Sequence, residues 1–175
     1  MSWFDGSHLS KSPAQWDAAK LSWVNAHYLK TIDESRLAAL AADQLKRRGI
    51  DAAAERVQSL VPLFKDRCTT TVELADWLAM YFADVNPTPE DLATHVTDAV
   101  KPAIATLRDK LASVEWTKAA ISAAIKETIA AHGLKMPQLA HAVRVKVCGR
   151  AQTPSIDAVL ELFSKDLVIE RLRRG

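Results

Sequence analysis

The most informative stretch of this sequence is Leu134-Lys-Met-Pro-Gln-Leu-Ala-His-Ala-Val-Arg-Val-Lys-Val-Cys-Gly-Arg-Ala-Gln-Thr-Pro154. It predicts a short helix from Pro137 to about Val147, ended by Gly149. Proline suits the first helical turn because its missing N–H would have no partner there, and glycine suits the left-handed residue that ends a helix. The apolar residues of this helix recur at helical spacing and form one stripe: Leu139, Ala142, Val143 and Val147.

Three basic residues accompany this predicted helix. Arg144 and Lys146 lie off the apolar stripe, and Arg150 follows the terminating glycine. A positive helix end beside a loop of small residues can hold an anion or a nucleotide base. The same pattern also fits an ordinary amphipathic helix with solvated basic side chains, so the stretch alone leaves both interpretations open.

Composition indicates a globular, helical chain. Of the 175 residues, 49% are hydrophobic and 25% are charged, with only 5 glycines and 7 prolines. This excludes a disordered chain and favours an all-α fold, a helical bundle that the length allows to be one domain or two small subdomains. The net charge of +2 is too small to indicate nucleic acid by itself. Local basic clusters are more informative, and they lie at 46–48, 144–150 and 171–174.

Several classes of protein are not supported. No apolar run approaches the roughly 18 residues of a membrane span, and no signal peptide precedes the chain, so we expect a cytoplasmic protein. Cys68 and Cys148 are far apart and form no CxxC pair, which argues against a disulfide framework or a zinc site. No phosphate loop, nucleophile elbow, dinucleotide fingerprint or HExxH pattern is present, so neither a metal nor a catalytic residue is predicted.

Proline and helix-capping residues predict the domain organisation. The segment 84–88, which contains Asn86-Pro87, is the clearest linker, and it divides the chain into a first helical subdomain at 12–85 and a second at 86–175. Residues 1–11 are expected to connect to an upstream part. Ser12 and Pro13 predict the start of the first helix, and Trp16 and Trp23 share one face of it. We expect these tryptophans to be core residues rather than a platform for base stacking.

Further helices are predicted from apolar spacing and capping residues. A second helix covers 32–48, with Leu40 among its inward residues, and a third contains Pro62, which could kink it. A fourth runs from 72 to 82 with Trp77 and Tyr81 buried, and a fifth starts at Thr88-Pro89 and continues to Val100. Thr117 is expected to cap a helix that His132-Gly133 ends.

Four segments, in order, resemble the C-terminal, anticodon-binding region of bacterial glutamyl-tRNA synthetases. The stretch quoted first resembles the family's "plR-x-a-l-t-G … t-P" segment. Ser12-Pro-Ala-Gln-Trp-Asp-Ala-Ala-Lys-Leu-Ser-Trp-Val-Asn-Ala-His-Tyr28 resembles "sPAkFD-x-x-KL-x-W-x-N-x-x-Y". Leu63-Phe-Lys-Asp-Arg-Cys-Thr-Thr-Thr-Val-Glu-Leu74 resembles "l-v-k-e-R-a-k-t-l-x-E-l", and Phe163-Ser-Lys-Asp-Leu-Val-Ile-Glu-Arg-Leu172 resembles "l-G-K-e-x-x-l-x-R-L". Together they cover essentially the whole chain.

This resemblance implies a function and a set of site residues. Helical domains of this family form a cage around the three unstacked anticodon bases. The arginine that reads the third base falls on Arg67, and the arginine near the first base falls on Arg144. The loop that frames the middle base falls on Thr153, Pro154 and Ile156. Phosphate contacts are expected from the basic clusters, namely Lys46, Arg47, Arg48, Lys146 and Arg150.

The resemblance also implies what the chain lacks. ATP and Mg²⁺ belong to the family's catalytic part, whose motifs are absent from this sequence, so the chain is expected to be no enzyme by itself, to need no cofactor, and to bind glutamate tRNA as a monomer. Three family positions differ: Ala142 replaces a proline, and Ser155 and Ser164 replace glycines. An α-helical protein–protein interaction module without RNA binding remains the alternative, and a helical enzyme with a hidden acid pair is a more distant one.

Overall fold

The computed structural model describes residues 16–174, and every regular element among them is helical. The α-helices are α1 (Ala18–Thr31), α2 (Glu34–Lys46), α3 (Ala54–Phe64), α4 (Thr71–Leu78), α5 (Pro89–His95), α6 (Lys101–Ser113), α7 (Lys118–His132), α8 (Met136–Cys148), α9 (Ile156–Glu161) and α10 (Lys165–Arg173). Two 3-10 turns, η1 (Lys65–Arg67) and η2 (Ala79–Tyr81), flank α4. The predicted all-α fold is confirmed.

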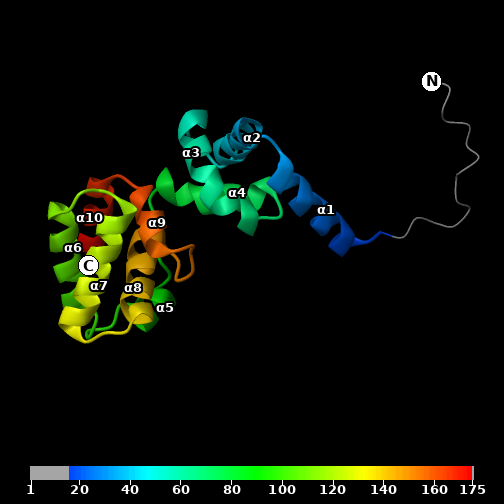
Figure 1. Cartoon of the computed structure of the whole chain (residues 1–175). Coiled ribbons are helices and arrows are strands. Elements are labelled where there is room, and N and C mark those ends of the chain that lie inside the picture. The colour runs from blue at the N-terminus through cyan, green and yellow to red at the C-terminus, as the bar shows by residue number, and fades with distance from the viewer. Residues whose placement is uncertain (1–15, 175) are drawn as a thin grey trace, which may run out of the picture.

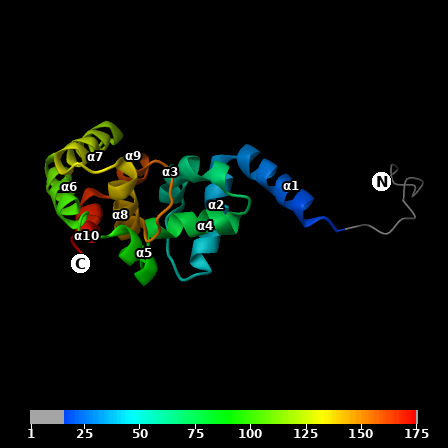
Figure 2. The same ribbon diagram turned by 90° about the horizontal axis from the view of Figure 1, so that it is seen from below.

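The helices form two packed groups beside a projecting first helix (Figure 1). In one group α2 packs on α3 and α4, and in the other α6 to α10 pack on one another with α5 against α8. Figure 2 shows the same order of α1, the α2–α4 group and the α5–α10 group along the molecule. The segment 84–88 between the groups is not helical. One continuous apolar core includes residues of both groups. The division into subdomains at 12–85 and 86–175 therefore remains a prediction.

Threonine side chains cap three of the helices, and two of these caps, Thr88 and Thr117, were predicted from the sequence. Thr70, Thr88 and Thr117 each accept a hydrogen bond from a backbone N–H of the first turn, at 3.0, 3.1 and 3.3 Å. These bonds satisfy donors that would otherwise have no partner inside the helix. Gly133 and Gly149 end α7 and α8 in the left-handed conformation, with φ of 61° and 73°. The stripe predicted for α8 is fully buried: Leu139, Ala142, Val143 and Val147.

The expectation that Trp16 and Trp23 belong to the core is wrong. Trp16 is 76% exposed and Trp23 is 70% exposed, and Leu29 alone is buried among the residues of this helix. The physical reason is that α1 packs mainly against η1 near its C-terminal end, so no described element covers its first turns. Trp23 instead stacks on His27, with ring centroids 6.0 Å apart.

Several helix limits also differ from the sequence expectation. Asp17 caps α1, whereas the predicted start at Ser12-Pro13 lies outside the described residues. The fourth helix stops at Leu78 and continues as a 3-10 turn, and Trp77 and Tyr81 are only partly buried. The fifth helix ends at His95 rather than Val100, because Val96 leaves the helical conformation with ψ of 57°.

Two further differences concern single side chains. Pro62 lies inside α3 without ending it, since the helix continues to Phe64. Leu40, expected to face inward, is 40% exposed because it lies beside the buried stripe of α2 rather than on it. No helix among the described residues is long and apolar enough to cross a membrane.

Candidate functional site

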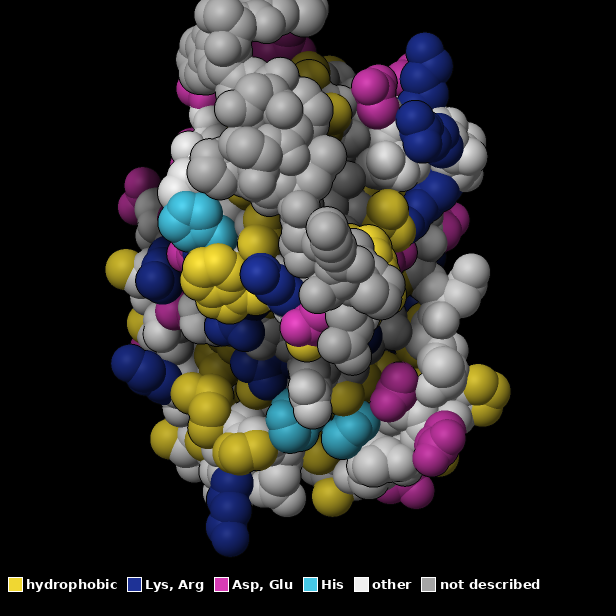
Figure 3. Space-filling model, turned by 90° about the vertical axis from the view of Figure 1, so that its right-hand side faces the viewer, with side chains coloured by type: hydrophobic (Ala, Val, Ile, Leu, Met, Phe, Trp, Pro, Cys, Tyr) yellow, Lys and Arg dark blue, Asp and Glu magenta, His cyan; other side chains and the backbone are white. Residues whose placement is uncertain are grey.

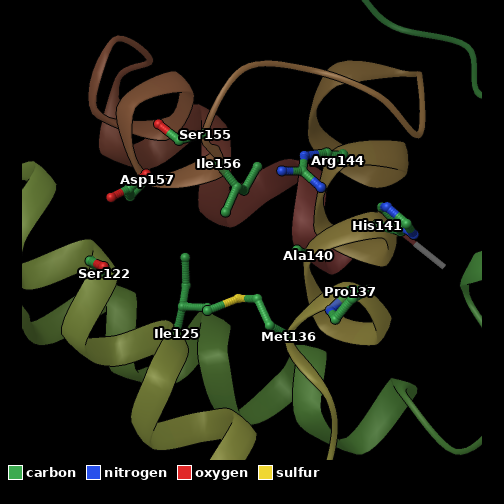
Figure 4. A pocket seen from close by; sticks show the side chains of 10 residues that line it. All are labelled: Ser122, Ile125, Met136, Pro137, Ala140, His141, Arg144, Ser155, Ile156 and Asp157. Atoms are coloured by element: carbon green, nitrogen blue, oxygen red, sulfur yellow. The ribbon is translucent and has the colours of Figure 1, made fainter.

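A cavity of about 390 Å³ lies between α7, α8 and the start of α9. Its apolar lining includes Ile125, Met136 and Ile156, and its polar lining is Ser122, His141, Arg144, Ser155 and Asp157. Figure 4 shows Met136 and Ile125 on one side of this cavity and Arg144 and Ile156 on the other. A concave site with apolar walls and a few polar groups can enclose a flat ring and bind its polar edge.

The loop after α8 holds Arg144 in place. The Nε of Arg144 donates to Oγ1 of Thr153 at 3.0 Å. The Thr153 hydroxyl in turn donates to the carbonyl of Pro154 at 2.9 Å. Burial lowers the pKa of Arg144 below its ordinary value, but a guanidinium remains charged at neutral pH. Hydrogen bonds therefore join Arg144, Thr153 and Pro154, all of which were named from the sequence. Ile156 lies beside them in the lining of the cavity.

His141 is a residue of this site that the sequence analysis did not select. It lies one helical turn before Arg144 and also lines a neighbouring hollow of about 200 Å³ together with His95. The two imidazole rings are 5.1 Å apart between centroids. Burial, and then the nearby Arg144 and His95, lower the pKa of His141, so its ring is neutral at pH 7. Its spacing of three residues from Arg144 was the available signal, since such residues share a helix face.

Arg67 lies in a different place, at the end of η1 between α3 and α4. It is exposed and is not among the residues that line the cavity. The chain around it is well fixed: Cys68 is buried, and Glu73 accepts hydrogen bonds from the backbone N–H and the hydroxyl of Thr69 at 2.7 and 2.9 Å. The guanidinium of Arg67 thus projects from an ordered turn at the N-terminal end of α4.

The candidate phosphate-binding residues divide into exposed and engaged ones. Lys46 and Arg47 are exposed at the end of α2. Arg48 forms an ion pair with Asp76, and Arg150 donates to the backbone carbonyl of Asp76 at 3.1 Å. These two arginines therefore link neighbouring segments to α4 in addition to carrying charge.

Arg150 and Lys146 have further contacts. The guanidinium of Arg150 lies 4.5 Å from the centre of the Trp77 ring, a cation–π arrangement. Lys146 donates to the carbonyl of Arg174 and lines a hollow of about 310 Å³ between α6, α8 and α10. It is therefore on another side of α8 from the cavity that contains Arg144.

Two observations concern metal-binding groups and the cysteines. Among residues 16–174, no group of three or more His, Cys, Asp or Glu side chains is arranged to hold a metal ion. Burial raises the pKa of the Cys68 thiol to about 11 and that of the Cys148 thiol to about 12. Neither cysteine is thus a ready nucleophile, because the thiolate is the reactive form.

Figure 3 shows Lys and Arg side chains interspersed with hydrophobic ones on the face that includes α1.

Comparison with protein families gives a match over most of the chain. The model of the family described as "Anticodon binding domain" matches residues 36–175. The chain belongs to this family. This domain has relatives among the glutamate–tRNA ligases. It is 58% identical over 173 residues to the glutamate–tRNA ligase of Leptothrix cholodnii. It is 53% identical over 176 residues to the glutamate–tRNA ligase of Paracidovorax citrulli.

These alignments include nearly all of the domain but a minor part of each relative. They cover 98% and 99% of this chain and 37% of each ligase, so the chain spans little more than a third of the length of these relatives. A solved structure of a glutamate–tRNA ligase from Elizabethkingia meningosepticum has the same fold over 97% of this chain and 34% of that one. The TM-score is 0.82 and the sequence identity is 19%. The domain is thus homologous to the C-terminal part of a glutamate–tRNA ligase.

Proposed function

We propose that this anticodon-binding domain binds the anticodon loop of glutamate tRNA. The observation that carries the proposal is the cavity beside Arg144, whose guanidinium is held by Thr153 opposite an apolar wall. Anticodon bases can unstack from a single-stranded loop, pack against apolar or aromatic groups and be read at their Watson–Crick edges. The membership of the anticodon-binding family and the ligases among its relatives support the same proposal.

Each base is assigned a reader. We assign the first base to Arg144 and the middle base to the loop of Thr153, Pro154 and Ile156. We assign the third base, cytosine in glutamate tRNA, to Arg67. A guanidinium has only donors, and the Watson–Crick edge of cytosine offers two acceptors, whereas a guanine at this position would present mainly donors. The exposed position of Arg67 on an ordered turn supports this role.

The phosphates of the loop need cationic partners that are not tied to the protein. We propose Lys46 and Arg47 as these contacts, because both are exposed. Arg48, Lys146 and Arg150 are weaker candidates, since each already binds a carboxylate or carbonyl of the chain. Phosphate contacts make affinity fall with salt without affecting which base is preferred.

The wider context is also a proposal. We infer that the domain serves a cytoplasmic ligase that joins glutamate to tRNA, that it acts there as a monomer, and that it has no ligase activity of its own. ATP and Mg²⁺ would then be used by a catalytic part outside this chain.

A matched pair of variants tests the proposal. We expect Arg144→Ala to weaken binding of the glutamate anticodon stem–loop by roughly thirtyfold at low salt, about 2 kcal/mol, because one charged donor set is lost from the cavity. Arg173→Ala removes the same charge from an exposed position on α10 and should change affinity less than threefold. Fluorescence anisotropy with a labelled stem–loop measures both. Equal losses for the two variants would refute a specific role of the cavity.

One observation favours a second function. Trp23 and Tyr28 on α1, together with Trp16 just before it, expose large apolar surfaces. Exposed apolar patches commonly mark protein interaction sites. A helical protein-interaction module without RNA binding therefore remains the alternative, and absence of stem–loop binding by the unaltered chain at low salt would favour it.

A further inference from the structure

Arg171 of α10 is the most completely buried charged residue among those described, with 2% of its surface exposed. Its Nη1 donates to the carbonyls of Met80 and Val147 at 2.9 and 2.7 Å. Its Nη2 donates to the carbonyl of Ala83 at 2.8 Å. The guanidinium also lies 5.3 Å from the centre of the Phe163 ring. This buried cation thus donates its hydrogen bonds to carbonyls and lies over a ring face, and no carboxylate among residues 16–174 accepts a hydrogen bond from it.

The three carbonyls belong to two helix ends. Met80 and Ala83 lie in and just after η2, which continues α4, and Val147 lies in the last turn of α8. Carbonyls at a helix end have no intrahelical donor, and they carry the negative end of the helix dipole. One guanidinium therefore binds the C-terminal end of α8 and the end of the turn η2 that continues α4 at the same time.

Those two helices connect to the candidate readers of the anticodon. Arg67 lies four residues before the start of α4, and Arg144 lies on α8 one turn before Val147. Other contacts join the same two segments. Arg150, just after α8, lies against Trp77 of α4 and donates to the Asp76 carbonyl.

The aromatic residues around Arg171 extend this junction. Tyr81 stacks on Phe163 with ring centroids 4.1 Å apart, and its hydroxyl donates to the carbonyl of Val159 at 3.1 Å. The Nε of Arg171 has no hydrogen-bond partner among the described residues. Leaving a buried donor unpaired is costly, so the side chain is positioned for the three carbonyls rather than for full pairing of its own donors.

We infer that Arg171 is a positioning residue that fixes α4 relative to α8, so that Arg67 and Arg144 contact the same anticodon loop. The inference rests on the proposed function. A planar guanidinium can reach three carbonyls from one position, whereas a lysine ammonium is a single point of charge. Arg171→Lys keeps the charge but should not maintain the hydrogen bonds to all three carbonyls.

The relative position of the helices can be measured without RNA. Spin labels at Glu55→Cys on α3 and Lys126→Cys on α7 lie on exposed positions of the two helical groups. The native Cys68 and Cys148 are buried, and burial raises the pKa of both thiols, so the introduced cysteines react preferentially. We expect one narrow distance distribution in the unaltered chain and in the control Arg173→Met. Arg171→Lys and Arg171→Met should broaden it.

Folding must be separated from positioning. Circular dichroism at a temperature well below the unfolding midpoint should show unchanged helix content in each variant used. If Arg171→Met unfolds, Arg171→Lys and Phe163→Leu, which removes the ring beneath the guanidinium, still test the inference. A distribution that stays narrow in folded Arg171→Lys and Phe163→Leu would overturn it.

A binding cycle tests the consequence for the anticodon loop. We expect Arg67→Ala to weaken binding of the glutamate stem–loop about tenfold in the unaltered chain. In the Arg171→Lys background it should weaken binding less than about threefold, because the two arginines no longer engage the loop together. An undiminished tenfold effect in that background would overturn the positioning role. No binding by the unaltered chain would overturn the proposed function, and the distances alone would then decide whether Arg171 fixes the helices.

Discussion

Arg67 and Arg144, the two arginines assigned to base reading, are held in different ways. Arg144 is partly buried on α8, with its Nε fixed by Thr153 at 3.0 Å and its side chain lining a cavity. Arg67 is exposed at the end of a three-residue turn. Only the backbone around Arg67 is fixed, whereas at Arg144 the side chain is fixed as well.

The difference has an energetic meaning. A long side chain that is immobilised on binding costs about 0.5–1.5 kcal/mol in lost rotamer freedom. Arg144 has lost much of that freedom before RNA arrives, so its interactions contribute more fully to affinity. Arg67 loses it on binding, so its net contribution is smaller and is best detected as a difference between bases. We therefore expect Arg144 to dominate affinity and Arg67 to dominate discrimination.

The largest expected effect concerns the backbone that positions Arg144. Gly149 has φ of 73°, and a Cβ added there would lie 3.0 Å from Cβ of Val85. Gly133 has φ of 61° with nothing within 4 Å of such a Cβ. We predict that Gly133→Ala lowers the free energy of unfolding by about 1 kcal/mol, through the left-handed conformation alone. Gly149→Ala should lower it by roughly 3 kcal/mol, through conformation plus overpacking.

Urea denaturation of both glycine variants measures the difference. Equal losses would mean that the linker residue Val85 moves aside freely. The end of α8 would then not be rigidly packed against Val85, in the segment that follows η2.

A smaller effect is expected from the hydrogen bond that fixes Arg144. Thr153→Val keeps the shape of the side chain but removes the hydroxyl that accepts from Arg144 and donates to Pro154. We predict a loss of about 1 kcal/mol in stem–loop binding, roughly fivefold. Thr31→Val, which removes a hydroxyl on α1, serves as the control. Unchanged affinity in Thr153→Val, measured by anisotropy, would show that Arg144 needs no fixing.

The smallest effect is a pH dependence at His141. Burial, Arg144 and His95 lower the pKa of His141 in the folded chain, so the unfolded chain takes up a proton first as the pH falls. The free energy of unfolding should therefore decrease as the pH falls through the ordinary histidine value near 6.5, and the decrease should stop below the folded pKa. His141→Gln should lose less stability than the unaltered chain between pH 7 and pH 5. If the free energy of unfolding changed with pH in the same way in His141→Gln and the unaltered chain, a lowered pKa of His141 would be refuted.

Much of the fold could be predicted because its signals are local. Thr70, Thr88 and Thr117 cap helices with their own side chains, and Gly133 and Gly149 end helices through their own φ angles. The apolar stripe of α8 followed from helical periodicity. The resemblance to a family named Arg144 and Thr153 as separate site residues, but the hydrogen bond between them was not predicted.

The remaining features depend on contacts between segments far apart in the chain. Trp16 and Trp23 have the periodicity of a buried face, but burial depends on what covers the helix, which no local pattern reports. Arg171 belongs to a basic cluster in the sequence, yet its guanidinium donates to carbonyls 24 and 91 residues away. His141 joins the cavity because α7 and α9 pack beside α8. Only His141 had a local signal, its spacing of three residues from Arg144, whereas the outcomes at the tryptophans and at Arg171 depend on distant segments.

The most direct test of the account is binding to two tRNA transcripts at low salt. One is glutamate tRNA, and the other differs only in the third anticodon base, changed from C to G. The account predicts that the unaltered chain prefers the first by about tenfold, that Arg67→Ala abolishes the preference, and that Arg47→Ala weakens both transcripts alike. Equal binding of the two transcripts by the unaltered chain would contradict the reading of the anticodon by this domain.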